Sequence, residues 1–522
     1  MGGLFGVVSR ENCITDLFYG IDYHSHLGTT IGGLVVLSDT ITKPICHEIT
    51  NSHFKTEFKD DFDKQKGNLG IGVISSREED KQPLVFRSKL GTFALCTDGF
   101  IKNADTLIEE IIENGISFKE GSSKVNQTEL VGELICKGVN ITEGITKMYD
   151  KIHGTISLIL LSETERCIYA SSGVFPLVLG KKTTVKGDNF AVTSETSAFS
   201  NLNYEIQTYL EYKDIVSINE LSIKTKMKSR EKIVFCPFLH VYFDFPTSCH
   251  YGISGEIVRE RCGDFLAQND NIKPSLIMGV ADSGIPHAHG YAKGKLKLGI
   301  KKAKKIVNRF IQGIINSDEL KDDLTETFES MAPLRRPVIK FTAAWGRSYI
   351  PPQQSTRELV AYYKQVSNPQ IIRDQSIVLV DDSIRRGTQL KRYLKDKIQP
   401  HRPKEVHARI GSPPQLFACY FDETTKRSDL IAWRAVKKIE GGEPKDISEY
   451  LEVSSKKYQM LNAIIQEAIG TISLKFISLD DMIKAIIEAP ENTILKEENL
   501  CTYCWSGKKP ILNDAIFQAK LL

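Results

Sequence analysis

The chain has 522 residues, more than one ordinary hydrophobic core organises, so we expect at least two domains. Its composition, with 41% hydrophobic and 25% charged residues and a formal net charge of +3, is typical of a soluble globular protein and gives no reason to expect nucleic acid as a partner. No apolar run is long enough to cross a bilayer and the N-terminus lacks a secretory signal, so we expect a cytoplasmic protein without a membrane partner, whose 11 cysteines are not paired in disulfides.

Roughly the first 230 residues combine short β-type runs with a few helical segments. GTFALCT and GTISLILLS are typical of strands, whereas ADTLIEEIIENG and NQTELVGELICKG have the apolar spacing of helices. This mixture predicts layered α+β packing. The basic stretch near residues 225–232 is interpreted as a linker.

After this stretch the pattern changes to apolar runs that end in turns and are separated by helical segments. PSLIMGV (274–280), SIVLVDD (376–382) and EVHARIG (405–411) are such runs. The alternation predicts a parallel sheet with crossover helices, in which ligands bind at the carboxyl ends of the strands. The loops VADSG (280–284) and VDDSIRRGT both lie at such ends.

The segment KGKLKLGIKKAKKIVNR (293–309) is strongly basic. A nucleic-acid patch is one interpretation and a solvated helix face is the other. We favour the solvated face, because the acidic run DELKDDLTETFE follows closely and offsets the charge.

Two adjacent carboxylates, Asp381 and Asp382, end the strand SIVLVDD. They could hold a hydrated Mg²⁺ or bond a vicinal diol. Gly387 permits close backbone approach, and the hydroxyls of Ser383 and Thr388 with nearby N–H groups would cradle an anion at the start of a helix. A diol on one side and a phosphate on the other describe a ribose 5-phosphate; the alternative is a charged loop that only caps a helix.

VDDSIRRGT resembles the phosphoribosyl pyrophosphate (PRPP) loop of type I phosphoribosyltransferases, and above all that of the amidophosphoribosyltransferases. VADSGIPHAHGYA (280–292), WGRSYIPPQQSTRE (345–358) and CPFLHVYFDFPTS (236–248) are similar to that family's pyrophosphate loop, closing flap and domain junction. The resemblance implies an α+β N-terminal-nucleophile-type αββα sandwich over residues 1–230. An α/β type I phosphoribosyltransferase domain would follow over residues 231–522, with a C-terminal cluster-binding segment.

The resemblance also implies the binding residues. Mg²⁺ would be held by Ser283, Asp381 and Asp382. PRPP would be bound by these three residues and by Asp282, Gly284, Arg347, Ser383, Arg385, Arg386, Gly387 and Thr388. Ala281 stands where the family usually has proline, and about fifty residues separate GYA from the flap, so the region 293–330 resembles an insertion.

The motif CTYC (501–504) alone is as compatible with a redox pair or with chance as with a metal. One branch of the family, however, carries a [4Fe-4S] cluster on four cysteines, and those positions match Cys236, Cys419, Cys501 and Cys504. The implied role is structural, tying the C-terminus to the domain junction. The remaining cysteines are expected in the core.

The chemistry of the N-terminal domain is missing. The family's glutaminase begins with a cysteine nucleophile, but Gly2 stands there and has no thiol; Cys13 lies beyond the opening strand and lacks a free amine. Val73 stands at the arginine that holds the glutamine carboxylate, Asp98 at the asparagine of the oxyanion loop, and Gln127 at a conserved aspartate position of the family motif. In the flap, Thr342, Ala343 and Ala344 replace an Asn-Arg-Tyr run.

Two functions fit these patterns. The first is an amidophosphoribosyltransferase of purine biosynthesis that forms 5-phosphoribosylamine from PRPP, with ammonia or an ammonia-donating partner as the nitrogen source. The second is a non-catalytic regulatory relative that binds PRPP or nucleotides. The resemblance implies a homo-oligomer in either case.

Overall fold

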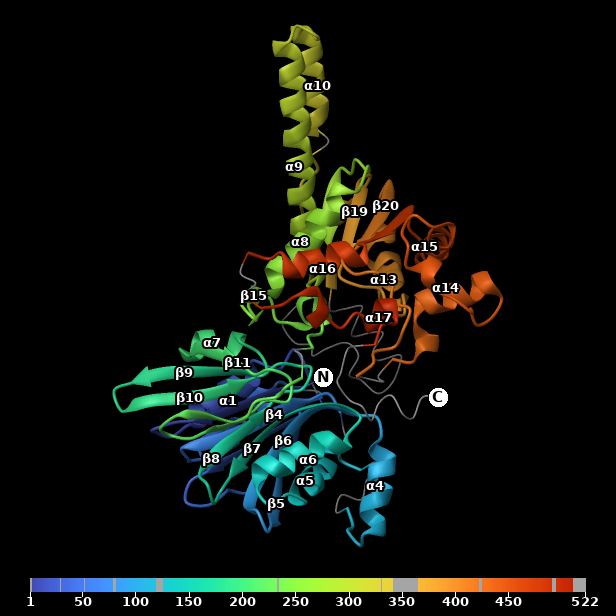
Figure 1. Cartoon of the computed structure of the whole chain (residues 1–522). Coiled ribbons are helices and arrows are strands. Elements are labelled where there is room, and N and C mark those ends of the chain that lie inside the picture. Colours follow the sequence, from blue (N-terminus) through green and yellow to red (C-terminus); the bar gives the residue numbers. More distant parts are fainter. Residues whose placement is uncertain are drawn as a thin grey trace.

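The computed structural model describes residues 2–28, 30–50, 52–77, 81–118, 125–231, 234–329, 331–340, 365–421, 425–490 and 494–509. Two halves are stacked along the long direction of the molecule, and a helical hairpin projects from the second half (Figure 1). Among the described residues, no helix is both long enough and apolar enough to cross a membrane.

The described strands of the first half form two antiparallel sheets. The seven-stranded sheet has the order β11-β9-β10-β1-β4-β2-β3 and contains β1 (Gly3–Val8), β2 (Ile31–Leu37), β3 (Ile45–Glu48), β4 (Leu69–Ser75), β9 (Val178–Thr184), β10 (Gly187–Thr193) and β11 (Glu205–Tyr209). The six-stranded sheet has the order β13-β12-β8-β7-β6-β5 and contains β5 (Leu84–Ser88), β6 (Gly91–Ile101), β7 (Gly154–Ser162), β8 (Cys167–Ser171), β12 (Ile215–Ile218) and β13 (Ile223–Met227).

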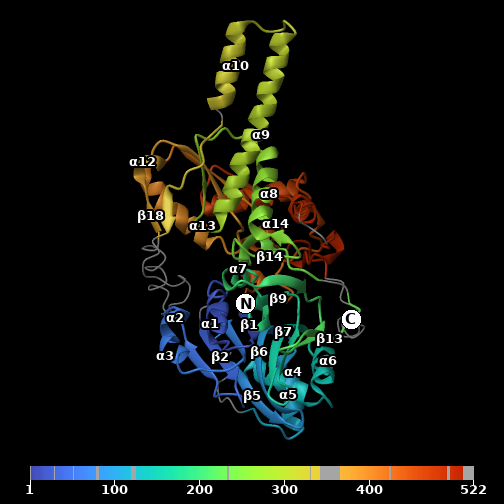
Figure 2. The ribbon, with the colours of Figure 1, turned by 90° about the vertical axis from the view of Figure 1, so that its left-hand side faces the viewer.

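The two sheets face each other across a shared apolar core, to which β4 contributes Ile71 and β7 contributes Leu161. Helices cover both outer faces (Figure 2). The seven-stranded sheet is covered by α1 (Ile14–Asp22), α2 (Phe54–Glu57), α3 (Lys59–Phe62) and α7 (Ser197–Leu202), and the six-stranded sheet by α4 (Ala104–Glu113), α5 (Gln127–Cys136) and α6 (Ile141–Lys151). The order of layers is therefore helix, sheet, sheet, helix.

The predicted linker begins later than the sequence indicated. The first part of the basic stretch belongs to β13, which pairs antiparallel with β12 at the edge of the six-stranded sheet. Most of its charged side chains are exposed, so the strand stays basic while its backbone completes the sheet. A short alternating segment at a sheet edge is easily mistaken for a linker, because its charge dominates the pattern.

The second half contains a parallel sheet of β16 (Leu276–Gly279), β19 (Ser376–Asp381), β20 (Glu405–Ile410) and β21 (Ser473–Phe476), paired in that order. The three predicted strands lie within this sheet. One face is covered by α13 (Thr388–Tyr393), α14 (Ile431–Glu440) and α15 (Lys456–Ile469), and the other by α8 (Gly255–Gln268), α9 (Gly284–Ile311) and α16 (Leu479–Ile487).

Shorter elements connect these layers. They are the π-helical turns η1 (Leu239–Phe243) and η2 (Leu394–Ile398), the strands β14 (Cys249–His250), β15 (Ile253–Ser254), β17 (Val338–Lys340) and β18 (Gln365–Ser367), and the helices α12 (Pro369–Ile372) and α17 (Tyr503–Ser506). The 28-residue helix α9, about 42 Å long, continues well past the sheet and folds back as α10 (Ser317–Glu329).

Candidate functional site

The loops that follow β16 and β19 lie side by side at the carboxyl edge of the parallel sheet. Gly279 pairs with Val380, and the N–H of Val280 donates to the carbonyl of Val380 at 2.9 Å. A Cβ atom on Gly284 would lie 2.4 Å from the same carbonyl oxygen, so only glycine allows this approach. Two motifs about a hundred residues apart in sequence thus form one site.

The two carboxylates are the centre of this site. The N–H of Asp382 donates to Oδ1 of Asp381 at 3.0 Å, and the hydroxyl of Ser383 donates to Oδ1 of Asp382 at 2.5 Å. Ser283, from the other loop, also hydrogen-bonds to the Asp382 carboxylate. Burial and then the charge of Asp382 raise the pKa of Asp381 well above its usual range, and burial raises the pKa of Asp382 as well. Two buried carboxylates with raised pKa values favour a bound proton, a diol or a cation.

The loop then turns into a helix at the end of the predicted anion-binding segment. Gly387 has φ 80°, a left-handed conformation, and α13 begins at Thr388. A Cβ atom on Gly387 would lie 2.5 Å from Cδ1 of Ile431, so both the conformation and the packing require glycine. Residues 382–387 therefore form the loop that connects β19 to α13.

The predicted charged residues of the site are partly engaged with other side chains. Arg386 forms an ion pair with Asp429 at 3.1 Å, and Asp282 forms one with Lys340 at 3.0 Å. The Nε atom of Arg385 is buried and has no hydrogen-bond partner among the described residues. Arg347, like the flap segment 345–358 and residues 342–344, lies outside the described residues. Lys340 was missed by the sequence analysis, because no local motif marks it.

The four cysteines of the predicted cluster set are brought together from three distant segments. The N–H of Cys501 donates to the carbonyl of Phe235 at 2.9 Å, which places Cys501 beside Cys236. The carbonyl of Cys504 accepts from the N–H groups of Leu416 and Phe417, which places Cys504 beside Cys419. Trp505 stacks on Phe238 with ring centroids 5.2 Å apart, so the C-terminal segment is fixed to the segment that opens the second half.

The thiols influence one another's ionisation. A hydrogen bond with Cys419, burial and the neighbouring Cys501 and Cys236 raise the pKa of Cys504 well above its ordinary value. Burial, followed by the charges of Cys419 and Cys501, raises the pKa of Cys236. Within the described part of the chain, however, no group of three or more His, Cys, Asp or Glu side chains has the spacing of a metal-ion site.

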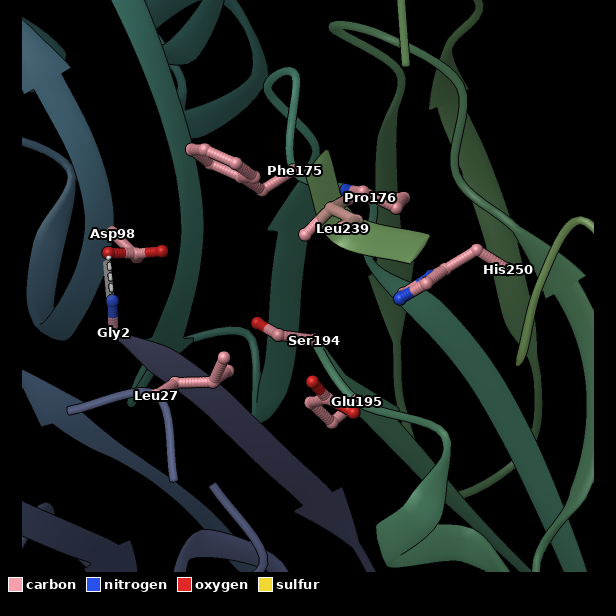
Figure 3. Close-up of a pocket in the computed structure, with 9 residues that line it drawn as sticks. All are labelled: Gly2, Leu27, Asp98, Phe175, Pro176, Ser194, Glu195, Leu239 and His250. Atoms are coloured by element: carbon pink, nitrogen blue, oxygen red, sulfur yellow. Dashed lines mark hydrogen bonds between the residues drawn. The ribbon is translucent and has the colours of Figure 1, made fainter. Parts of the chain in front are cut away.

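A second candidate site lies where the two halves meet, around Gly2 (Figure 3). The N–H of Gly2 donates to Oδ1 of Asp98 at 2.8 Å. Gly2 and Asp98, the two residues predicted to stand at the family's cysteine and asparagine positions, are therefore in direct contact. The pocket beside them has a volume of about 20 Å³, which is room for about one water molecule. Its walls are Gly2, Leu27, Asp98, Phe175, Pro176, Ser194 and Glu195 from the first half and Leu239 and His250 from the second.

The other altered positions serve the structure of the first half. Val73 is fully buried between the two sheets, and Gln127 accepts a hydrogen bond from Arg77 at 3.1 Å. Cys13 is 1% exposed, and burial raises its pKa to about 12, so its thiol is not a ready nucleophile. None of the three lines the pocket.

Sequence reasoning missed a group of buried polar residues beside this pocket. Glu195 bonds to Nε2 of His26 at 2.9 Å and to the hydroxyl of Ser248. Asp244 bonds to Nδ1 of His240 at 2.9 Å and lies 3.2 Å from Nε2 of His250. His240 and Asp244 lie in the predicted domain-junction segment 236–248, whereas Glu195, His26 and His250 lie in no recognised motif.

Residues 71–201 match the family model of the glutamine amidotransferase domain. The amidophosphoribosyltransferase of Bacillus subtilis is 25% identical over 523 residues, covering 97% of this chain and 94% of that protein. The amidophosphoribosyltransferase of Methanocaldococcus jannaschii is 27% identical over 540 residues, covering 98% of each chain.

Solved structures agree with these relatives. The glutamine PRPP amidotransferase of Bacillus subtilis complexed with ADP and GMP superposes with a TM-score of 0.74 at 25% identity, covering 97% of each chain. The structure described as the allosteric regulatory enzyme of purine biosynthesis has a TM-score of 0.75 at 24% identity, covering 97% of this chain and 96% of that one, and shares the fold. Over nearly its whole length, this chain is a homologue of the amidophosphoribosyltransferases.

Proposed function

We propose that this chain forms 5-phosphoribosylamine from PRPP in purine nucleotide biosynthesis, and that it uses ammonia, free or from a partner, as the nitrogen donor. Ammonia would attack the anomeric carbon, the bond from that carbon to pyrophosphate would break, and one proton would be released. The contact between Ser283 and the Asp381–Asp382 pair carries this proposal, because it joins the two predicted PRPP loops into one site.

The site offers a complementary group for each part of PRPP. The loop 383–388, with its backbone N–H groups and the hydroxyls of Ser383 and Thr388, would hold the 5-phosphate. Asp381 and Asp382 would bond the ribose diol, and the loop 281–284 would face the pyrophosphate. Arg385, Arg386 and, in the flap, Arg347 would add positive charge around the phosphates.

Mg²⁺ suits the same residues. A divalent cation would stabilise the ionised forms of these two adjacent carboxylates, whose pKa values are raised mainly by burial, and oxygen atoms from Ser283, Asp381 and Asp382 are the ligands that Mg²⁺ prefers. Bound there, Mg²⁺ would neutralise the developing charge of the pyrophosphate leaving group.

The proposal that ammonia is the nitrogen donor rests on the residues of the first half. We propose that residues 1–230 form an N-terminal-nucleophile-type αββα domain without glutaminase activity, ahead of a type I phosphoribosyltransferase domain at 231–522. Gly2 supplies no nucleophile, and the carboxylate of Asp98 would repel an oxyanion. A cytoplasmic location stays a prediction.

We also propose that Cys236, Cys419, Cys501 and Cys504 hold a [4Fe-4S] cluster, although their thiols do not have metal-site spacing in the described structure. Cys236, Cys419, Cys501 and Cys504 are buried or half-buried thiols that suppress one another's ionisation, and thiolates become stable there when iron supplies positive charge. We expect a brown protein with about four iron atoms per chain when it is prepared without oxygen. Cys504→Ala should abolish iron binding, whereas Cys46→Ala, on the edge strand β3, should leave the iron content unchanged.

The decisive assay measures pyrophosphate release from PRPP and Mg²⁺, with ammonium chloride or with glutamine as the donor. We expect release with ammonium chloride only. The double variant Asp381→Asn/Asp382→Asn should lose PRPP binding by calorimetry, whereas Asp446→Asn, on the surface, should bind as the wild type does.

Each other outcome has a defined meaning. Tight PRPP binding with no pyrophosphate release from either donor would reject the enzyme and favour the regulatory relative. Release with glutamine would reject our interpretation of Gly2. No PRPP binding by the wild type would reject the site itself.

A further inference from the structure

The projecting helix α9 carries a row of large apolar side chains that nothing in the described structure covers. Leu296 is 49% exposed, Ile300 45%, Val307 38% and Phe310 39%, and Ile314 at the tip of the hairpin is 60% exposed. Within α9 the spacing of the first four, which is four, seven and three residues with Ala303 in the gap of seven, is the spacing of a coiled-coil seam. We call this row the α9 seam.

The α9 seam is distinct from the face with which α9 packs on its own hairpin partner. On that inner face Ile306 is 4% exposed, and a Cβ atom on Gly299 would lie 2.0 Å from Cε of Met331. At 3.6 residues per turn, the two faces are separated by roughly 80° around the helix. This is close to the right angle between the two neighbours of a helix in a four-helix bundle. The hairpin therefore has the surface of half a bundle.

The charges of the hairpin are divided between its helices. Residues 293–311 contain eight Lys or Arg and no acid, whereas α10 contains six Asp or Glu and one Lys. Arg309 pairs with Asp323 inside the hairpin at 3.7 Å, and Lys297 pairs with Asp264 on α8. Among the described residues, no ion pair is formed by Lys301, Lys304, Lys305, Asp318 or Asp322.

We propose that the hairpins of two copies of this chain pack about a two-fold axis into a four-helix bundle, in which the α9 seam of each copy is covered by α10 of the other. Direct packing of α9 on its own copy would bring two basic helices together, whereas the acidic α10 neutralises it. Each basic helix would then lie between two acidic ones, its own and its partner's. Phe328 of α10, 56% exposed, supplies apolar surface for the same contact.

Nucleic acid is a poorer occupant of this surface. A phosphate backbone gains nothing from the apolar α9 seam, and the acidic α10 beside it would repel phosphates. The second copy satisfies both the apolar and the charged parts of the hairpin.

The first test measures the mass of the full chain by light scattering during a dilution series. Ile300→Asp/Val307→Asp should remove one interface, so the mass falls by half at concentrations where the wild type stays paired. The control Ile472→Asp/Leu221→Asp changes two apolar residues elsewhere that are more exposed, at 62% and 78%, and should leave the mass unchanged. A monomeric wild type, or a seam variant with the wild-type mass, would overturn the proposal.

The second test distinguishes contact between copies from contact within one hairpin. One variant reverses the charge of α9 (Lys301→Glu/Lys304→Glu/Lys305→Glu). Another reverses the charge of α10 (Asp318→Lys/Asp322→Lys). Each alone should lose the dimer, and an equimolar mixture should regain it as a heterodimer, because α9 of one variant then faces α10 of the other with opposite charge. Circular dichroism checks that both variants keep their helices. Failure of the mixture to form a heterodimer, or wild-type dimerisation of both single variants, would contradict the arrangement. If the wild type binds DNA or RNA and the α9 charge-reversal variant does not, nucleic acid is the partner of the hairpin instead.

Discussion

Gly2 lies in a space that no larger residue fits. A Cβ atom there would lie 2.3 Å from the carbonyl oxygen of Ile74, because β1 and β4 pair directly beside it. The surroundings have therefore closed around the missing side chain. The backbone packing itself therefore leaves no room for a side chain at position 2.

Gly2→Cys should consequently fail to restore glutaminase activity. The new side chain must push β4 aside, which costs about 1–3 kcal/mol of folding free energy, and the carboxylate of Asp98 beside it would repel an oxyanion. Glutamate released from glutamine is the measurement, with Gly2→Ala as the control for the steric effect alone. Glutamate production by the cysteine variant would show that the fold of the site is intact.

Asp381 illustrates a residue kept at a cost in stability. Its raised pKa means that the folded chain holds this proton to a higher pH than the unfolded chain does. The resulting stabilisation is complete below the unfolded pKa of about 3.9 and is lost as pH rises through the raised folded pKa. As pH rises, ionisation of the carboxylate pair therefore increasingly opposes folding.

Asp381→Asn should raise the free energy of unfolding by about 1–2 kcal/mol at pH 8, and by less at pH 5. Urea denaturation at both pH values without Mg²⁺ measures this. Asp105→Asn, on the exposed side of α4, is the matched charge control. An equal effect of Asp381→Asn at the two pH values would contradict the ionisation argument.

On the scale of elements, a buried ion pair and its hydrogen-bond partner join three parts of the second half. Nε of Arg409 on β20 donates to Asp270, in the loop after α8, at 2.5 Å, and the hydroxyl of Tyr291 on α9 donates to the same carboxylate at 2.6 Å. Burial alone would raise the pKa of Asp270, but the hydrogen bonds and charge of Arg409 lower it to about 2. The base of the projecting hairpin is thus tied to the central sheet.

Arg409→Leu should destabilise the protein by about 3–5 kcal/mol, because Asp270 is left buried without its counter-charge. The double variant Asp270→Asn/Arg409→Leu should recover much of this loss, since no charge remains to be desolvated. Thermal and urea unfolding of both variants measure the difference. Equal losses for the single and the double variant would assign the effect to packing.

For the whole molecule, the C-terminal segment connects regions that are far apart in sequence. Phe235 donates to the carbonyl of Asn499 and accepts from Cys501, and this joint packs on Val174 and Tyr212 of the first half. The same few residues thus connect the start of the second half, its end and the neighbouring first half.

Trp505→Ala should loosen this joint without unfolding the sheets. The indole is 2% exposed and stacks on Phe238, so its removal leaves a cavity that costs about 3–5 kcal/mol. Hydrogen exchange should accelerate at the amides of Phe235 and Cys501 and stay unchanged at β1 and β10. Uniform acceleration across both halves would instead indicate global destabilisation.

Much of the parallel sheet and of the candidate PRPP site could be predicted from the sequence, because the motifs that mark them are local. The strands that carry Asp381 and the loop with Gly387 are continuous motifs, and the absence of a thiol at Gly2 is visible in one letter. The strand β13 could not be predicted, since pairing at a sheet edge overrides local propensity in a short charged segment.

By itself, then, the sequence determined which chemical groups this protein has: a carboxylate pair, a polar loop with a glycine, four cysteines in a family spacing and a glycine at position 2. Only the tertiary structure decided which of them meet. Ser283 contacts Asp382 and Cys504 contacts Cys419, because strand register and helix packing bring together segments that are far apart in the sequence. The same packing leaves the α9 seam partly exposed. Each residue determines its own side-chain chemistry, whereas hydrophobic burial of the whole chain determines which side chains lie close together.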